Sequence, residues 1–140
     1  MLLLFNQQPY HHALLRTAER LLAQGEPTIA VITAHIACEV YAEQILAFAF
    51  KKRGVADVAE AVSELLPSNN LANERVRKLY TALTGDEIQN TAFWSRFKES
   101  ATLRNKAVHS RKRASAEQAQ ETCETAHELV KHLATIARAL

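Results

Sequence analysis

The amino-acid sequence predicts an all-helical fold of one domain, and composition and length are the observations that predict it. The 140 residues include only three Gly and three Pro, so little interrupts long helices. Ala, Leu, Glu, Arg and Gln, which favour the helix, are abundant. A chain of this length can bury roughly two-thirds of its unfolded surface, so residues 1–140 can fold as a single domain without disulfides or metals.

Helix-breaking residues set the expected bounds of the first two helices. A helix over residues 11–24 is expected to end at Gly25, and Pro27 suits the first position of a second helix that continues to residue 53. The second helix is the most apolar of the chain. A helix of that composition is normally the central one, covered by others on most sides.

Three further helices are expected between residues 55 and 109. One spans residues 55–66, and another spans residues 71–83 with Asn70 as its N-cap. The next carries the apolar side chains from Ile88 onward, and Asp86 is favourable at its start because a carboxylate there complements the helix dipole. The sequence therefore predicts five to six helices in all.

The last expected helix begins after a capping box formed by Ser115 and Gln118 and runs to about residue 140. Small and apolar residues recur along it at steps of four and three, as in a helix that packs along one seam. We expect this seam to pack within the chain, although it could also pair two chains. Its positions are Ala119, Cys123, Ala126, Val130, Leu133, Ala137 and Leu140.

A polar stripe interrupts the apolar second helix. His35, Glu39 and Glu43 are four residues apart and share one face. Either this stripe faces solvent or bonds its neighbours along the helix, or Glu39 points at a cation in a cleft. Buried carboxylates are rare unless they are paired, which favours the first interpretation.

Positive charge is concentrated in residues 104–113. The whole chain has a net charge of +2, which is too small for a general polyanion binder, whereas this segment carries +5 and the remainder −3. Such asymmetry indicates a focused anion site, although a solvated basic turn would look the same in sequence. The cations are Arg104, Lys106, Arg111, Lys112 and Arg113.

Cysteine usage and hydropathy predict a cytoplasmic protein with no membrane span. Cys38 and Cys123 lie within apolar helical patterns and outside any metal-binding spacing, which favours buried reduced thiols. The N-terminal MLLLF is too short for a secretory signal. The longest apolar stretch, residues 28–50, is interrupted by polar residues.

The spacing Arg104-Asn105-x-x-x-His109 resembles the R-(N/D/H)-x-x-x-H motif of the HEPN superfamily. The layout is similar too, because the motif ends the penultimate helix before a basic turn and a long final helix. The resemblance implies an up-and-down helical bundle and, as in many members, a metal-independent endoribonuclease. It also implies a homodimer, RNA as the partner, and a role as a toxin, stress or phage-defence factor, with an antitoxin or partner protein as a further expectation.

The residue types of the motif suit RNA cleavage without a metal or cofactor. His109 can transfer protons because its pKa lies near neutrality, and Arg104 can bind the phosphate and its transition state. Asn105 can orient either side chain. Lys106, Arg111, Lys112 and Arg113 would hold the flanking phosphates without reading sequence. Glu39 is expected to support Arg104 through an ion pair.

Residues five apart on a regular helix are separated by about 140°, so Arg104 and His109 would not be neighbours. Three arrangements would bring them together: a helix that ends before His109, a curled Arg104 side chain, or two motif copies facing each other across a two-fold axis. The resemblance implies the last. In one subgroup of HEPN toxins, the antitoxin modifies a Tyr two residues after the motif His. This sequence differs from that subgroup, because the corresponding position is Arg111.

Two alternatives compete with the nuclease. A HEPN-like module without catalysis could use the basic turn to bind nucleic acid, nucleotide or an acidic protein. A carboxylate di-metal bundle would use Glu124-x-x-His127, but such sites need a second copy of that spacing, which the sequence lacks. No metal and no cofactor are therefore expected.

Overall fold

The computed structural model describes residues 9–140, and this part of the chain is entirely helical, with no strand. This confirms the predicted fold class. The helices are α2 (Tyr10–Ala23), α3 (Pro27–Lys52), α4 (Ala56–Leu65), α5 (Glu74–Thr84), α6 (Trp94–His109) and α7 (Ala116–Ala139), with a short 3-10 helix, η1 (Ile88–Asn90), before α6.

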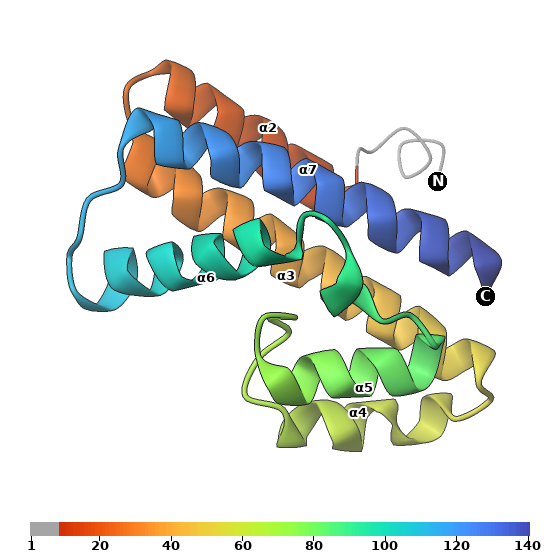
Figure 1. The fold of residues 1–140 in the computed structure, drawn as a ribbon. Coiled ribbons are helices and arrows are strands. Elements are labelled where there is room, and N and C mark those ends of the chain that lie inside the picture. The colour runs from red at the N-terminus through yellow and green to blue at the C-terminus, as the bar shows by residue number, and fades with distance from the viewer. Residues whose placement is uncertain (1–8) are drawn as a thin grey trace, which may run out of the picture.

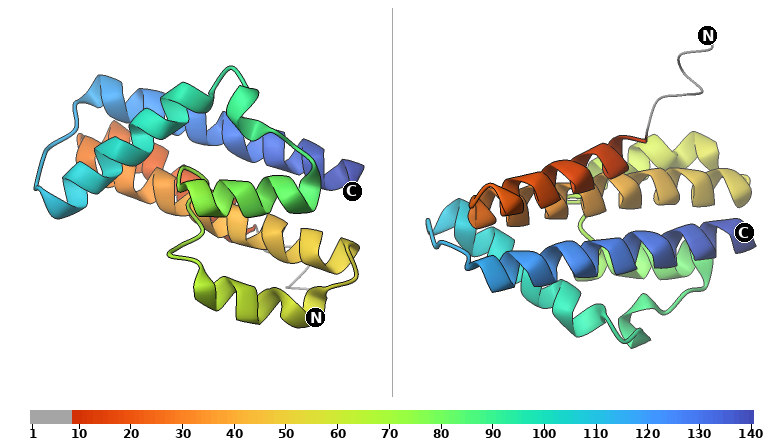
Figure 2. Two further views of the ribbon diagram at one scale, coloured as in Figure 1. Left: turned by 60° about the horizontal axis from the view of Figure 1, so that its bottom comes forward. Right: turned by 90° about the horizontal axis from the view of Figure 1, so that it is seen from above.

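Helix α3 is the centre of the bundle, as its composition predicts. It contacts α2, α4, α5, α6 and α7, while α7 and α2 lie along its length on one side (Figure 1). Successive helices alternate in direction, so the α2–α3 turn and the α6–α7 turn meet at one end of the molecule and the α3–α4 turn lies at the other (Figures 1 and 2). At 26 residues, α3 spans about 39 Å between these two ends.

Local sequence signals set the ends of several helices as predicted. Gly25 adopts a φ of +80° after α2, which only glycine reaches without strain, and Pro27 is the first residue of α3. The capping box of α7 is complete. The Ser115 hydroxyl accepts the Gln118 N–H at 3.1 Å, and the Gln118 side chain accepts the Ser115 N–H at 2.9 Å.

The predicted N-cap of α5 is wrong. Asn73, not Asn70, caps this helix, because its side chain accepts the backbone N–H groups of Arg75 and Val76. Asn70 closes a tighter turn just before the helix by accepting the Ala72 N–H at 3.0 Å. Both are local asparagine caps, and the sequence alone does not rank them.

The predicted start of the fifth helix is also wrong. Helix α6 begins at Trp94, and Asp86 lies eight residues earlier. The Asp86 carboxylate instead accepts the Tyr80 hydroxyl at 2.6 Å and contacts the His132 Nε2 atom at 2.7 Å, which joins α5 to α7. Burial, followed by the hydrogen bond to Asp86, raises the pKa of Tyr80.

The predicted seam of α7 packs inside the chain. Five of its seven positions are buried and the last two are half-buried against the same core. Cys38 and Cys123 are both free and buried, as predicted. Burial raises the pKa of Cys38 to about 12 and that of Cys123 to about 11, so both remain protonated thiols near neutral pH.

By length and composition, α3 could cross a membrane. Half of its most apolar stretch is buried against the other helices, as in the core helix of a soluble protein. Length and composition are the same for a membrane-spanning helix and for such a core helix.

Candidate functional site

Helix α6 carries the Arg104-Asn105-His109 motif and remains helical through His109. The helix therefore does not end before the histidine, and about 140° and 7.5 Å of rise separate the two positions. Arg104 is half-buried, whereas Asn105 and His109 are exposed. The Arg104 guanidinium donates to the Asn105 side-chain oxygen at 3.2 Å, which is the contact that an orienting asparagine requires.

Two residues of the polar stripe on α3 lie within the electrostatic reach of Arg104. The His35 side chain is 1% exposed and stacks on the Phe97 ring of α6, with centroids 5.7 Å apart. Burial, followed by the charge of Arg104, lowers the pKa of His35 to about 4, and only the Asn70 side chain opposes this change. His35 is therefore neutral at physiological pH.

Glu39 is less deeply placed than His35. Its side chain is 25% exposed, and Glu43, one turn further, is exposed, so the stripe passes from the core to the surface. Burial raises the pKa of Glu39, while the positive charge of Arg104 opposes that rise. Within residues 9–140, no ion pair of 4 Å or less joins Glu39 to Arg104. The nearest partner of the carboxylate is the His35 ring, at 3.7 Å.

The basic turn, defined here as residues 110–114, is held by backbone hydrogen bonds. Both the Ser110 N–H and the Lys112 N–H donate to the Lys106 carbonyl, at 2.9 and 3.2 Å. Arg111 adopts a φ of +55°, a left-handed conformation that glycine usually occupies after a helix. A non-glycine residue there costs about 1 kcal/mol.

One cleft, of about 510 Å³, lies between the basic turn and the start of α3. Arg111, Lys112 and Arg113 line it on one side, and Glu26, Pro27 and Thr28 line it on the other, so the lining holds three cations and one carboxylate. The Ala114 N–H donates to the Thr28 hydroxyl at 3.0 Å, which fixes the turn against the helix. The N-terminus of a long helix adds positive partial charge to these cations, and together they favour an anion.

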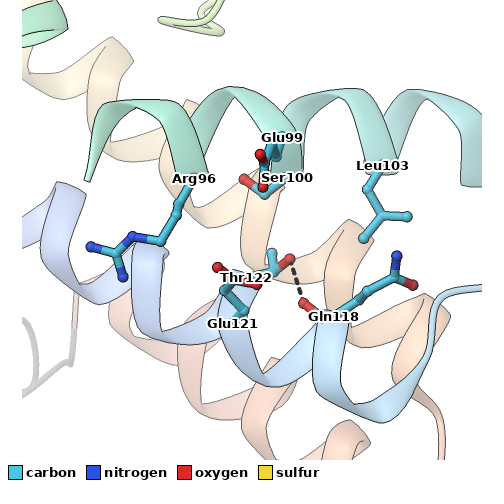
Figure 3. Close-up of a pocket in the computed structure, with 7 residues that line it drawn as sticks. All are labelled: Arg96, Glu99, Ser100, Leu103, Gln118, Glu121 and Thr122. Atoms are coloured by element: carbon cyan, nitrogen blue, oxygen red, sulfur yellow. Dashed lines mark hydrogen bonds between the residues drawn. The ribbon is translucent and has the colours of Figure 1, made fainter. Parts of the chain in front are cut away.

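A second cleft, of about 390 Å³, lies between α6 and α7. Its walls carry Lys98, Lys106 and Lys112, so Lys112 borders both clefts. It adjoins a smaller polar pocket of about 160 Å³ in which Ser100 of α6 faces Thr122 of α7 (Figure 3). Each cleft therefore has three cations and one carboxylate, Glu26 or Glu99, in its lining.

The structure brings together some predicted site residues and leaves others apart. Lys106, Arg111, Lys112 and Arg113 border the two clefts, and Arg104 contacts Asn105. His109 is exposed and lines neither cleft. Arg104 influences the pKa values of His35 and Glu39 on α3, whereas about 140° of helical rotation separates its position from that of His109.

Sequence reasoning missed two contributors to this surface. Lys98 lies two turns before Lys106, and that spacing of eight on one helix could have identified it. Thr28 had no such signal, because its contact with Ala114 joins residues 86 positions apart.

The residues of the di-metal alternative make other contacts. His127 pairs with Glu19 of α2, and Glu124 accepts a hydrogen bond from Gln120 at 2.9 Å. In the described part of the chain, no three His, Cys, Asp or Glu side chains are placed to hold a metal ion.

Comparison of the chain with protein-family models, with curated proteins and with solved structures found no match. Fold and site together thus define a class: an all-helical protein with one buried histidine in the polar stripe of its central helix and a basic turn at one end.

Proposed function

We propose that the protein is a metal-independent endoribonuclease with a HEPN-like helical bundle. The observation that carries the proposal is Arg111. A cation occupies a backbone position where glycine would be less strained, beside two further cations and the N-terminus of α3. A side chain kept at that energetic cost is expected to bind something, and phosphate is the ligand that suits this surface.

The chemistry assigned to the motif is an in-line attack on the RNA backbone. One His109 accepts the proton of a 2′-hydroxyl, and that oxygen attacks the adjacent phosphorus. Arg104 stabilises the charge of the phosphorane, and a second His109 gives a proton to the departing 5′-oxygen. The products are a 2′,3′-cyclic phosphate and a 5′-hydroxyl. Asn105 orients Arg104, with Glu39 as its support.

This chemistry requires a homodimer, because two histidines take part and the helical positions of Arg104 and His109 are about 140° apart. The neighbourhood of His109 suits a contact between copies, since Val108 beside it is 45% exposed. A two-fold contact at the end of α6 would duplicate each motif residue in one shared site.

Phosphate contacts by Lys106, Arg111, Lys112 and Arg113 would position RNA without reading its sequence. A cytoplasmic location fits the two free buried thiols. The proposed biological role is that of a toxin, stress or phage-defence factor controlled by an antitoxin or another partner protein.

The test is cleavage of total tRNA and other RNAs by the pure protein in EDTA. We expect cyclic-phosphate products from the wild type and a loss of at least about 100-fold with either His109→Ala or Arg104→Ala. His12→Ala, which removes another exposed histidine, is the matched control and should cleave normally. Absence of cleavage at high protein concentration, or equal cleavage by His109→Ala, would reject the nuclease.

A HEPN-like module that binds without cleaving is the second candidate. The electrostatic effect of Arg104 on His35, and the absence of His109 from the lining of both clefts, favour it. It predicts salt-dependent RNA binding that weakens with Lys112→Ala, no cleavage products, and harmless overexpression of both wild type and Arg104→Ala.

A further inference from the structure

Helix α4 is attached to the bundle differently from every other α-helix of the described chain, because it contributes no fully buried side chain. Only Ala59, Val62 and Leu66 pack against the core, and each remains partly exposed. An isolated ten-residue helix is marginal in water, so α4 depends on this modest contact. Figure 2 shows it as the outermost helix on its side of the bundle.

A second apolar face of α4 is uncovered. Val58 and Leu65 are 44% and 80% exposed, whereas Val55, which is 38% exposed, precedes the helix. Val58 and Leu65 are two of the seven exposed large hydrophobic residues of the described chain. Scattered single residues of this kind are ordinary, whereas a concentration on one element marks an interaction surface.

The charged residues of α4 itself are all acidic. Asp57, Glu60 and Glu64 are exposed, and no Lys or Arg occurs between Arg53 and Arg75. Within residues 9–140, none of the three carboxylates forms an ion pair. A ligand that approaches this surface therefore meets uncompensated negative charge next to apolar side chains.

Helical geometry places the exposed apolar side chains and the carboxylates of α4 side by side. At 100° per residue, Val58, Ala61 and Leu65 fall within about 60° of one another. The three carboxylates form a parallel stripe about 100° away, on the side opposite the buried face. We call the two stripes together the α4 surface. It has the pattern that a helix with one apolar and one cationic stripe would complement.

We propose that the α4 surface docks a cationic amphipathic helix of a partner protein, with apolar side chains against Val58 and Leu65 and Lys or Arg against the carboxylates. A second copy is a poorer occupant. A two-fold contact between α4 surfaces would oppose like charges, and the chain's own basic turn presents a single exposed apolar neighbour rather than a stripe. The proposal is independent of RNA cleavage, because α4 and the basic turn lie at opposite ends of α3 (Figure 1).

Binding of synthetic helical peptides to the full chain tests this proposal. The probe has a leucine stripe flanked by lysines, and the control peptide has glutamate in place of each lysine. Fluorescence anisotropy should detect the lysine peptide and not the glutamate peptide, and about 0.5 M NaCl should weaken the binding. Equal binding of both peptides would overturn the proposal.

Variants locate the site. Glu60→Lys combined with Glu64→Lys should weaken binding of the lysine peptide about tenfold, and Leu65→Ser should weaken that binding about fivefold. The matched control is Glu117→Lys with Glu121→Lys, which reverses another exposed i, i+4 pair and should change binding less than about twofold. Equal weakening by the control pair would mean unspecific attraction and would overturn the proposal. So would self-association that Leu65→Ser abolishes in sedimentation, because the occupant would then be a second copy.

Discussion

Helices α7 and α4 are both amphipathic, yet the chain holds them very differently. Eight side chains of α7 are buried, and a complete capping box fixes its start. Helix α4 has no buried side chain and no side-chain cap. The proposed phosphate surface therefore lies next to α7, a helix with many buried side chains, whereas the α4 surface lies on the helix that has none. Rigid placement suits a site that must align reacting atoms, and a loosely held helix suits docking.

The largest expected effect is on the free energy of unfolding, and it tests how much better α7 is packed than α4. Leu129→Ala in α7 removes a side chain with 0% exposure and should cost about 3 kcal/mol of unfolding free energy. Val58→Ala in α4 should change it by less than about 0.5 kcal/mol, because that side chain is exposed and alanine favours the helix. Urea denaturation measures both, and similar losses would show that α4 is as well packed as α7.

Acid should act on the bundle through His35. Its pKa is lowered from 6.5 to about 4 in the folded state, so the unfolded chain binds a proton first. Its contribution of roughly 3 kcal/mol is present above pH 6.5 and is lost as the pH falls toward 4. His11 acts in the same direction, and Glu39, with its raised pKa, acts in the opposite one.

Urea midpoints between pH 7 and 4 measure this dependence. His35→Phe keeps the ring against Phe97 and removes the titrating group, so its stability should fall less steeply. An unchanged slope would contradict the assignment to His35.

A smaller effect is expected at the link between α5 and α7. Asp86→Ala leaves the buried Tyr80 hydroxyl and the His132 ring without their shared acceptor and should cost about 2 kcal/mol. Asp57→Ala removes an unpaired exposed carboxylate and should cost less than about 0.5 kcal/mol. Thermal denaturation compares the two, and equal melting temperatures would show that the link contributes nothing.

The smallest expected effect concerns Arg111 and has the opposite sign. Arg111→Gly relieves the left-handed backbone and should stabilise the protein by up to about 1 kcal/mol, while RNA affinity and its salt dependence decrease. Arg113→Gly removes the same charge where no positive φ occurs, so it should weaken RNA binding without stabilising the fold. An equal change in the free energy of unfolding in both variants would contradict backbone strain at Arg111.

Local rules predicted much of this fold because they depend on adjacent residues. Gly25, Pro27 and the capping box of Ser115 were correctly placed for that reason. The error at Asn70 arose because two asparagines compete as local caps. The error at Asp86 has a tertiary origin, because Asp86 bonds to His132, 46 positions away, and this partner overrides a helix-start preference. At the candidate site, the motif was visible in sequence, but the effect of Arg104 on His35 and the contribution of Thr28 depend on contacts between distant segments.

The deep burial of Cys38 and Cys123 has a practical consequence. Maleimides react with thiolates, and neither native thiol ionises appreciably near pH 7. A single cysteine introduced at an exposed position could therefore carry a dye or spin label without prior removal of the natural ones. A pair of introduced cysteines, one near each end of α3, would likewise allow the distance between those ends to be measured in an otherwise unaltered chain.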